Sequence, residues 1–214
     1  MSERRPIASR NSKLAARVAR VLADRGISPN HISQASMVFA ALAGLAFWLS
    51  GNTDGFLYVL CLVGAALSCQ FRLLCNLFDG MVAVEGGRGE SDGPFWNEAP
   101  DRVADAFIFV GIGLGTGSPA LGWAAAAFAI GVAYVRELGS AQGLGADFRG
   151  PMAKQQRMAT VTAAAAIAIF APKIFGWSVL NIALWIIILG LSATILRRSL
   201  RMIASLKSTS QNDK

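Results

Sequence analysis

Residues 56–78 read FLYVLCLVGAALSCQFRLLCNLF and contain a single charged side chain, Arg72. About 20 consecutive apolar residues are enough to cross the hydrocarbon core of a bilayer as a helix. The stretch therefore predicts a membrane-spanning helix. The residue that follows it, Asp79, begins a polar segment, so we expect this end of the helix to lie at a membrane surface.

Five further apolar runs accompany this stretch. They cover approximately residues 33–50, 98–116, 119–138, 155–171 and 177–196. Over 214 residues the chain is 54% hydrophobic and only 15% charged, with a mean hydropathy of +0.47. Soluble domains carry about 25% charged residues, so the composition excludes an ordinary soluble domain and a disordered chain. The pattern predicts an all-α integral membrane protein with six transmembrane helices.

The positive charges are distributed unevenly between the connections. With six spans, both termini and the connections 79–97 and 139–154 share one side of the membrane, and only Lys173 of the 20 Lys and Arg residues falls in the opposite loops. Cytoplasmic loops carry an excess of Lys and Arg. We therefore predict a protein of the cell (inner) membrane with both termini in the cytoplasm. The cations flank apolar segments and form no soluble basic face, so we expect no nucleic-acid partner.

Residues 12–24, SKLAARVARVLAD, predict a short amphipathic cytoplasmic helix before the first span. One face carries Leu14, Val18, Val21 and Leu22, and the other carries Lys13, Arg17 and Arg20. Such a helix is suited to lying on an anionic membrane surface. The expected organisation is a cytoplasmic N-terminal segment (1–32), a six-helix transmembrane domain (33–200) and a polar C-terminal tail (201–214).

The acidic residues are concentrated in one region, with seven of the 13 between positions 79 and 105. On the second apolar helix, Asn76 and Asp79 lie three residues apart and share a face. On the third, Asn97, Asp101 and Asp105 repeat every four residues and share a face as well. If the two helices are neighbours, their oxygen atoms converge near the cytoplasmic interface. Such hard donors suit Mg²⁺ or Mn²⁺, which in turn bind phosphate oxygens.

The spacing of these residues resembles the signature of the CDP-alcohol phosphotransferases, D-x2-D-G-x2-A-R-x8-G-x3-D-x3-D. At its eight fixed positions this chain has Asn76, Asp79, Gly80, Ala83, Val84, Gly93, Asn97 and Asp101. Pro29 and Asn30 resemble the Pro-Asn pair with which the first span of the family begins. Six spans after an amphipathic helix also fit the family, so the resemblance covers nearly the whole chain.

The resemblance implies a reaction and a set of roles. In the family, four carboxylates hold divalent metal, and the fourth deprotonates the acceptor hydroxyl, which attacks the phosphorus that carries the lipid alcohol and releases CMP. The expected enzyme transfers a phosphatidyl group from a CDP-alcohol, with CDP-diacylglycerol as the expected donor, to a small alcohol in phospholipid biosynthesis. Asp79 is then a metal ligand, and Asp101 a ligand and the catalytic base. The residues implied in CDP binding are Pro29, Asn30, Gly80, Ala83 and Gly93.

Three positions depart from the family pattern. Asn76 and Asn97 replace its first and third aspartates, and Val84 replaces its arginine. The asparagines can still offer carbonyl oxygens, but two negative charges are lost. A pair of unit charges about 4 Å apart is worth roughly 4 kcal/mol at an effective dielectric constant near 20. The expected cofactor is therefore Mg²⁺ or Mn²⁺ as one or two ions, and two intact metal sites are the less expected arrangement.

Several candidate ligands have a second interpretation. Asp105, one turn beyond Asp101, either adds a carboxylate to the metal site or is a polar core group, for example a partner of Arg102. Asn97 is either a ligand or the N-cap of its helix, and both roles are compatible. Asn76 is either a ligand or a hydrogen-bonding group at the end of its helix.

Basic residues supply the candidates for binding the acceptor or a phosphate: Arg72, Arg88, Lys154 and Arg157. Arg72 alternatively extends to the lipid headgroups. Arg88 would replace the arginine that the family has at Val84. Lys154 and Arg157 lie where related enzymes carry a basic stretch near the acceptor pocket, and membrane anchoring explains them equally well.

Two hypotheses from different functional classes follow. The first is a divalent-metal-dependent CDP-alcohol phosphotransferase that works among membrane lipids. The second, suggested by the two asparagines, is a non-catalytic relative that binds a nucleotide lipid or a partner enzyme. The family includes homodimers, so a homodimer is a further expectation, and the acceptor alcohol is not specified by short motifs.

Overall fold

The computed structural model describes residues 12–85, 87 and 91–212. This part of the chain forms seven α-helices and one small hairpin. They are α1 (Lys13–Asp24), α2 (Pro29–Ser50), α3 (Gly55–Glu85), α4 (Gly93–Gly115), α5 (Pro119–Ala141), α6 (Lys154–Phe170), β1 (Lys173–Ile174), β2 (Trp177–Ser178) and α7 (Val179–Asn212). The six apolar runs of the sequence overlap α2 to α7 in order, which confirms the all-α architecture.

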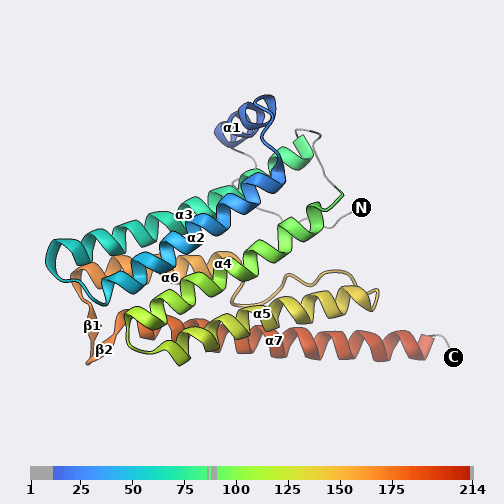
Figure 1. The fold of residues 1–214 in the computed structure, drawn as a ribbon. Coiled ribbons are helices and arrows are strands. Elements are labelled where there is room, and N and C mark those ends of the chain that lie inside the picture. Colours follow the sequence, from blue (N-terminus) through green and yellow to red (C-terminus); the bar gives the residue numbers. More distant parts are fainter. Residues whose placement is uncertain (1–11, 86, 88–90, 213–214) are drawn as a thin grey trace.

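Helices α2 to α7 run back and forth side by side (Figure 1). The end of α3, the start of α4, the loop between α5 and α6 and the end of α7 lie at one end of the bundle. The hairpin and the connections after α2 and α4 lie at the other end. The longer connections therefore share one end, as alternating helices require, whereas their cytoplasmic location remains a prediction.

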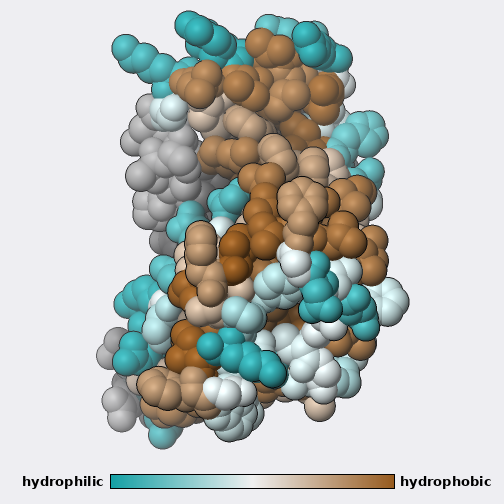
Figure 2. Space-filling view, turned by 90° about the vertical axis from the view of Figure 1, so that its left-hand side faces the viewer, coloured by the Kyte–Doolittle hydropathy of each residue, from teal (hydrophilic) through white to brown (hydrophobic). Residues whose placement is uncertain are grey.

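The surface of the bundle is largely apolar. Four of the described helices, α2, α3, α5 and α7, are long and apolar enough to cross a membrane. Large apolar side chains such as Leu60, Leu67 and Leu189 are at least half exposed on these helices, as expected for surfaces that face lipid. Figure 2 looks onto the hairpin end of the bundle and shows hydrophobic residues over much of it, with hydrophilic residues in separate patches. The chain is an integral membrane protein.

The two remaining helices are shorter or more polar. Helix α6 has 17 residues, and the first half of α4 contains Glu98, Asp101, Arg102 and Asp105. That α4 and α6 also cross the membrane, giving six spans in all, therefore stays a prediction.

Glycines allow α2, α4 and α5 to approach closely. A Cβ atom at Gly111 of α4 would collide with the backbone of Gly44 on α2, and one at Gly122 of α5 would lie 2.5 Å from the carbonyl oxygen of Phe109. Small residues at such contacts let membrane helices pack backbone against backbone. The close contact fixes α4 between α2 and α5, with its acidic first half at the polar end of the bundle.

Replacing Gly111 by alanine is expected to lower the free energy of unfolding by about 1–3 kcal/mol, because the added methyl group overpacks the helix contact. The matched control is Gly64→Ala in α3, where an added Cβ meets no atom within 4 Å. Thermal unfolding of the purified protein in one detergent compares the two. Equal melting temperatures for both variants would contradict the packing argument.

Helix α1 packs against α3 through its small residues. Three of its residues, spaced four apart, are buried: Ala15, Ala19 and Ala23. They belong to one cluster with Leu77 and Met81 of α3. Leu14 and Val21, which the sequence placed on the apolar face, are 69% and 43% exposed. A helix therefore forms at the predicted residues, and its contact with a membrane surface remains a prediction.

Some boundaries differ from those expected. Helix α4 begins at Gly93, five residues before the predicted run, because Pro94 occupies its first turn and Asp92 accepts hydrogen bonds from the next amides. Pro100 consequently lies inside the helix rather than in its first turn. Helix α7 continues to Asn212, so the expected boundary at residue 200 falls within one helix. The hairpin was not predicted, and its turn residues Phe175 and Gly176 both have positive φ angles.

Candidate functional site

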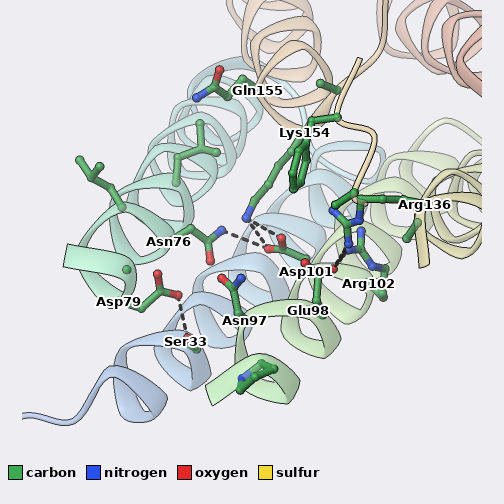
Figure 3. A pocket seen from close by; sticks show the side chains of 18 of the residues that line it. Ser33, Asn76, Asp79, Asn97, Glu98, Asp101, Arg102, Arg136, Lys154 and Gln155 are labelled. Carbon is green, nitrogen blue, oxygen red and sulfur yellow. Dashed lines mark hydrogen bonds and ion pairs between the residues drawn. The ribbon is translucent and has the colours of Figure 1, made fainter. Parts of the chain in front are cut away.

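A cavity of about 1140 Å³ opens at the polar end of the bundle. Its wall comes from α2 to α7 and from the loop between α5 and α6. Most of the residues that the sequence singled out line it: Pro29, Asn30, Asn76, Asp79, Gly80, Ala83, Gly93, Asn97, Asp101, Lys154 and Arg157. Figure 3 shows the polar side chains of α3, α4 and α6 directed into this space. The structure thus brings the signature positions together.

The signature residues of α3 and those of α4 face each other across the cavity, because these two helices do not pack directly against each other over most of their length. Helix α2 packs extensively against both α3 and α4, while α3 and α4 contact each other only sparsely. Their polar side chains nevertheless join, because Asn76 Nδ2 donates to Asp101 Oδ1 at 3.3 Å. The expectation that oxygen atoms of the two helices converge is met, but with α2 rather than a direct α3–α4 interface setting their separation.

Asp79 has one carboxylate oxygen bound and one that is not. Its side chain is buried at 5% exposure. Oδ2 accepts a hydrogen bond of 2.7 Å from Ser33 Oγ on α2 (Figure 3), whereas Oδ1 has no hydrogen-bond partner among the residues that the structure describes. A buried carboxylate oxygen without a partner is costly. A cation bound at this oxygen would remove that cost.

Asp101 is surrounded by nitrogen atoms. Lys154 Nζ lies 2.6 Å from both of its carboxylate oxygens. Arg72 Nη2 lies 3.5 Å from Oδ1, which also accepts the hydrogen bond from Asn76. Asp79 and Asp101 therefore have different surroundings, although both stand at aspartate positions of the signature.

Asn97 lies on α4 one turn before Asp101 and faces the same cavity (Figure 3). Helix α4 begins at Gly93, so Asn97 is within its second turn and cannot be its N-cap. That alternative from the sequence is wrong, and it fails because the helix starts earlier than the apolar run. Asn97 remains a candidate oxygen ligand.

Asp105 does not reach the cavity. Its Oδ1 lies 3.0 Å from Arg72 Nη2 and its Oδ2 lies 2.7 Å from Arg157 Nη2. All three side chains are at most 3% exposed. Because arginines bind both carboxylate oxygens, Asp105 does not fit the role of a metal ligand, and its partners are Arg72 and Arg157 rather than Arg102. Arg72 is buried and pairs with Asp105, so it does not extend to the lipid headgroups.

Two of the residues implied in CDP binding, Pro29 and Asn30, lie at the start of α2. Ser28 Oγ accepts a hydrogen bond from the amide of His31 at 3.3 Å and so caps this helix. Pro29 begins α2, and Asn30 Nδ2 donates to Asp92 Oδ1 at 2.9 Å. This contact ties the start of α2 to the start of α4 on the cavity wall. Arg88, the proposed replacement for the arginine lost at Val84, lies outside the described residues.

A second polar group on the cavity wall was not predicted. Glu98 Oε2 pairs with both Arg102 and Arg136 (Figure 3). The guanidinium of Arg136 also lies over the ring of Phe148 at 5.3 Å. The spacing of Glu98 and Arg102 indicated a helical ion pair, but no local signal connects either with Arg136, which is on α5. Further lining residues that the sequence did not single out are Ser33, Gln155 and Arg198.

Arg198 of α7, near the end of the last apolar run, is buried at 5% exposure. Its Nε donates to the carbonyl oxygen of Arg149 at 3.0 Å and its Nη1 to that of Val132 at 3.1 Å. Arg198 therefore fixes the loop between α5 and α6 against α7, on the cavity wall that also carries Lys154.

The cavity offers both carboxylate and amide oxygens as ligands for a divalent cation. Within residues 12–85, 87 and 91–212 there is no group of three or more His, Cys, Asp or Glu side chains that could hold a metal ion, so a metal here would also need amide oxygens. At the signature positions the cavity offers two carboxylates, Asp79 and Asp101, and two amides, Asn76 and Asn97. Carboxylate and amide oxygens are ligands that Mg²⁺ and Mn²⁺ accept. With the unpartnered oxygen of Asp79, this set fits a single divalent ion.

The chain is similar in sequence to a known enzyme, although no family model matches it. It is 24% identical over 193 residues to the phosphatidylinositol phosphate synthase of Mycolicibacterium smegmatis, and the alignment covers 87% of this chain and 82% of that protein.

Solved structures show the same fold. The crystal structure of Mycobacterium tuberculosis phosphatidylinositol phosphate synthase with CDP-DAG bound has a TM-score of 0.73 at 19% identity, covering 89% of this chain and 94% of that one. The same enzyme in complex with manganese and citrate has a TM-score of 0.72 at 19% identity, covering 88% of both chains. The spacing of the signature, the sequence similarity and the shared fold agree, and the chain is similar in sequence and fold to the CDP-alcohol phosphotransferases.

Proposed function

We propose that the chain transfers a phosphatidyl group from CDP-diacylglycerol to a small alcohol and releases CMP, as a divalent-metal-dependent enzyme of phospholipid biosynthesis. The observation that carries the proposal is the cavity in which Asp79 and Asp101 face each other with Asn76 and Asn97 at the signature spacing. Two further facts support it: the sequence relative is a phosphatidylinositol phosphate synthase, and the solved enzyme of the same fold has CDP-DAG bound.

The metal would be held by Asp79 together with the amide oxygens of Asn76 and Asn97. A bound Mg²⁺ or Mn²⁺ supplies positive charge to the pyrophosphate of the donor. Asp79 is suited to this role because Ser33 orients its carboxylate and leaves Oδ1 without a partner. The manganese in the related structure supports a divalent cofactor.

The proton of the acceptor hydroxyl would pass to Asp101. The hydroxyl oxygen then forms a bond to the phosphorus that carries the lipid, and the bond from that phosphorus to the CMP oxygen breaks. Asn76 and Lys154 position the Asp101 carboxylate from α3 and α6. A positioned general base typically contributes 10²–10⁴-fold to a rate.

The donor and acceptor would occupy different parts of the cavity. The start of α2 and the glycines of the signature, Gly80 and Gly93, leave room for the nucleotide beside Asp79. The acceptor would then lie toward α5 and α6, where Lys154 and Arg136 face the cavity. Lys154 and Arg136 would also attract an acceptor that carries a phosphate.

The setting in the membrane belongs to the same proposal. We place the chain in the cell (inner) membrane with six helices across it, with the cavity and both termini on the cytoplasmic side. Because the polar end of the bundle carries the cavity, the lipid tails of the donor would remain beside the apolar helices. A homodimer is an additional expectation from the family.

A second candidate is a relative that binds the nucleotide lipid without turning it over. The ion pair between Lys154 and Asp101 and the two asparagines favour it, because they reduce the negative charge available to metal. Purified protein in lipid nanodiscs, given CDP-diacylglycerol, Mn²⁺ and a panel of alcohols, separates the two. Alcohol-dependent release of CMP supports the enzyme, and saturable binding of the lipid without CMP release supports the binder.

A further inference from the structure

The structure assigns to Lys154 the role of a resident cation at Asp101, so that the site takes one divalent ion where Asp79 lies and none at Asp101. This inference rests on the proposed function and deepens it, because it defines the metal content of the site. It concerns a side chain that the proposed function uses only to position Asp101 and to attract the acceptor.

Lys154 contacts both carboxylate oxygens of Asp101 directly. The ammonium of Lys154 lies 2.6 Å from both oxygens of the Asp101 carboxylate, the position from which a cation pairs with both at once. Lys154 comes from the first turn of α6 and Asp101 from α4, so two separate helices hold the pair together. Asp101 is 7% exposed, which limits competition from water and salt.

Other polar groups also lie close to Asp101. Asn76 presents the NH2 half of its amide to Oδ1, at 3.3 Å. The guanidinium of Arg72 lies 3.5 Å from the same oxygen. A divalent ion at Asp101 would have to displace Lys154 and would meet the positive charge of Arg72. Like charges this close oppose each other strongly in a buried site.

Asp79, unlike Asp101, has no cationic partner among the described residues. Its Oδ2 accepts from the neutral hydroxyl of Ser33, and its Oδ1 is buried without a partner among the described residues. Only this carboxylate is available to a divalent ion without breaking an ion pair. Asp79 and Asp101 thus divide between two cations, one from the solution and one from α6, while the other two carboxylates of the cavity, Glu98 and Glu137, pair with arginines.

The role of Lys154 is linked with the asparagine at position 76. A carboxylate at this position could not donate to Asp101 and would repel it. The asparagine donates and leaves a single negative charge there, which one ammonium neutralises. The departure from the family pattern at Asn76 and the contact of Lys154 with Asp101 are therefore parts of one arrangement.

The test is a count of bound Mn²⁺ per chain. Protein in phosphatidylcholine nanodiscs is titrated with Mn²⁺, and the free ion is measured by its electron paramagnetic resonance signal. We expect one bound ion for the wild type, two for Lys154→Met, and one for Lys154→Arg, which keeps the charge. Lys173→Met is the matched control, because this lysine is exposed in the hairpin at the opposite end, and its count should equal that of the wild type.

The outcomes separate the inference from the proposed function. Two ions in the wild type, or one ion in a folded Lys154→Met variant, would overturn the inference, while CMP release by the same wild-type sample would leave the enzyme assignment intact. No bound ion together with no CMP release would overturn both. Melting curves establish that each variant is folded, and Lys154→Gln replaces the methionine variant if that one does not fold.

Discussion

Replacing Asp101 by asparagine is expected to reduce the release of CMP from CDP-diacylglycerol by about a hundred-fold to ten-thousand-fold. An amide cannot accept the proton of the acceptor hydroxyl, and loss of a general base costs 10²–10⁴-fold. The substitution preserves the shape of the side chain. It also removes the partner of Lys154, whose ammonium lies 2.6 Å away, so the position of the acceptor is disturbed as well. The measurement is the initial rate of CMP release at saturating Mn²⁺.

Asp54→Asn is the matched control for this experiment. Asp54 is exposed in the connection between α2 and α3, at the end of the bundle away from the cavity. Its loss should leave the rate within two-fold of the wild type, a tolerance on the order of 0.5 kcal/mol as is usual for surface substitutions. An unchanged rate in the folded Asp101→Asn protein would show that another group takes the proton.

The second large effect is expected from Asp105→Asn, which should lower the free energy of unfolding by about 3–5 kcal/mol. Asp105 is the common partner of Arg72 and Arg157, and all three side chains are buried. Removing the carboxylate leaves Arg157 without its counter-charge in the interior and leaves Arg72 with only the more distant carboxylate of Asp101, a change that is strongly destabilising. Thermal unfolding of the purified protein, followed by its helical signal, measures the loss.

A triple variant tests whether charge is the cause. Buried ion-pair triads can be replaced by apolar residues of similar volume without loss of stability. Arg72→Met, Asp105→Leu and Arg157→Met together should therefore be more stable than Asp105→Asn alone. A melting temperature of Asp105→Asn equal to that of the wild type would contradict the network and would return Asp105 to the list of candidate ligands.

The sequence contained most of the information about the helices. Runs of about 20 apolar residues predicted α2 to α7, because a span of that length has few alternatives in a membrane. The hairpin was missed, because two strands of two residues each leave no periodic pattern. The early start of α4 at Gly93 was missed because its first turn is polar and does not extend the apolar run.

The candidate site was predictable along each helix but not between helices. The spacing of Asn76 and Asp79, and that of Asn97 and Asp101, placed each pair on one face. Which charges pair across the cavity depends on helix packing, which spacing does not contain. Lys154 binds Asp101 from 53 residues away. The periodicity therefore left Asp105 either as a metal ligand or as a polar core group, while the packing of α3 and α6 against α4 gives it two arginines.

Phosphatidyl transfer at this cavity is tested most directly by following the phosphorus atom. The substrate is CDP-diacylglycerol labelled at the phosphorus that carries the lipid, supplied with Mn²⁺ and each alcohol in turn. The account predicts that for at least one alcohol the label moves into a new phospholipid, in an amount equal to the unlabelled CMP released. Label that stays in CDP-diacylglycerol with every alcohol at saturating Mn²⁺, or that appears only in phosphatidic acid, would contradict it.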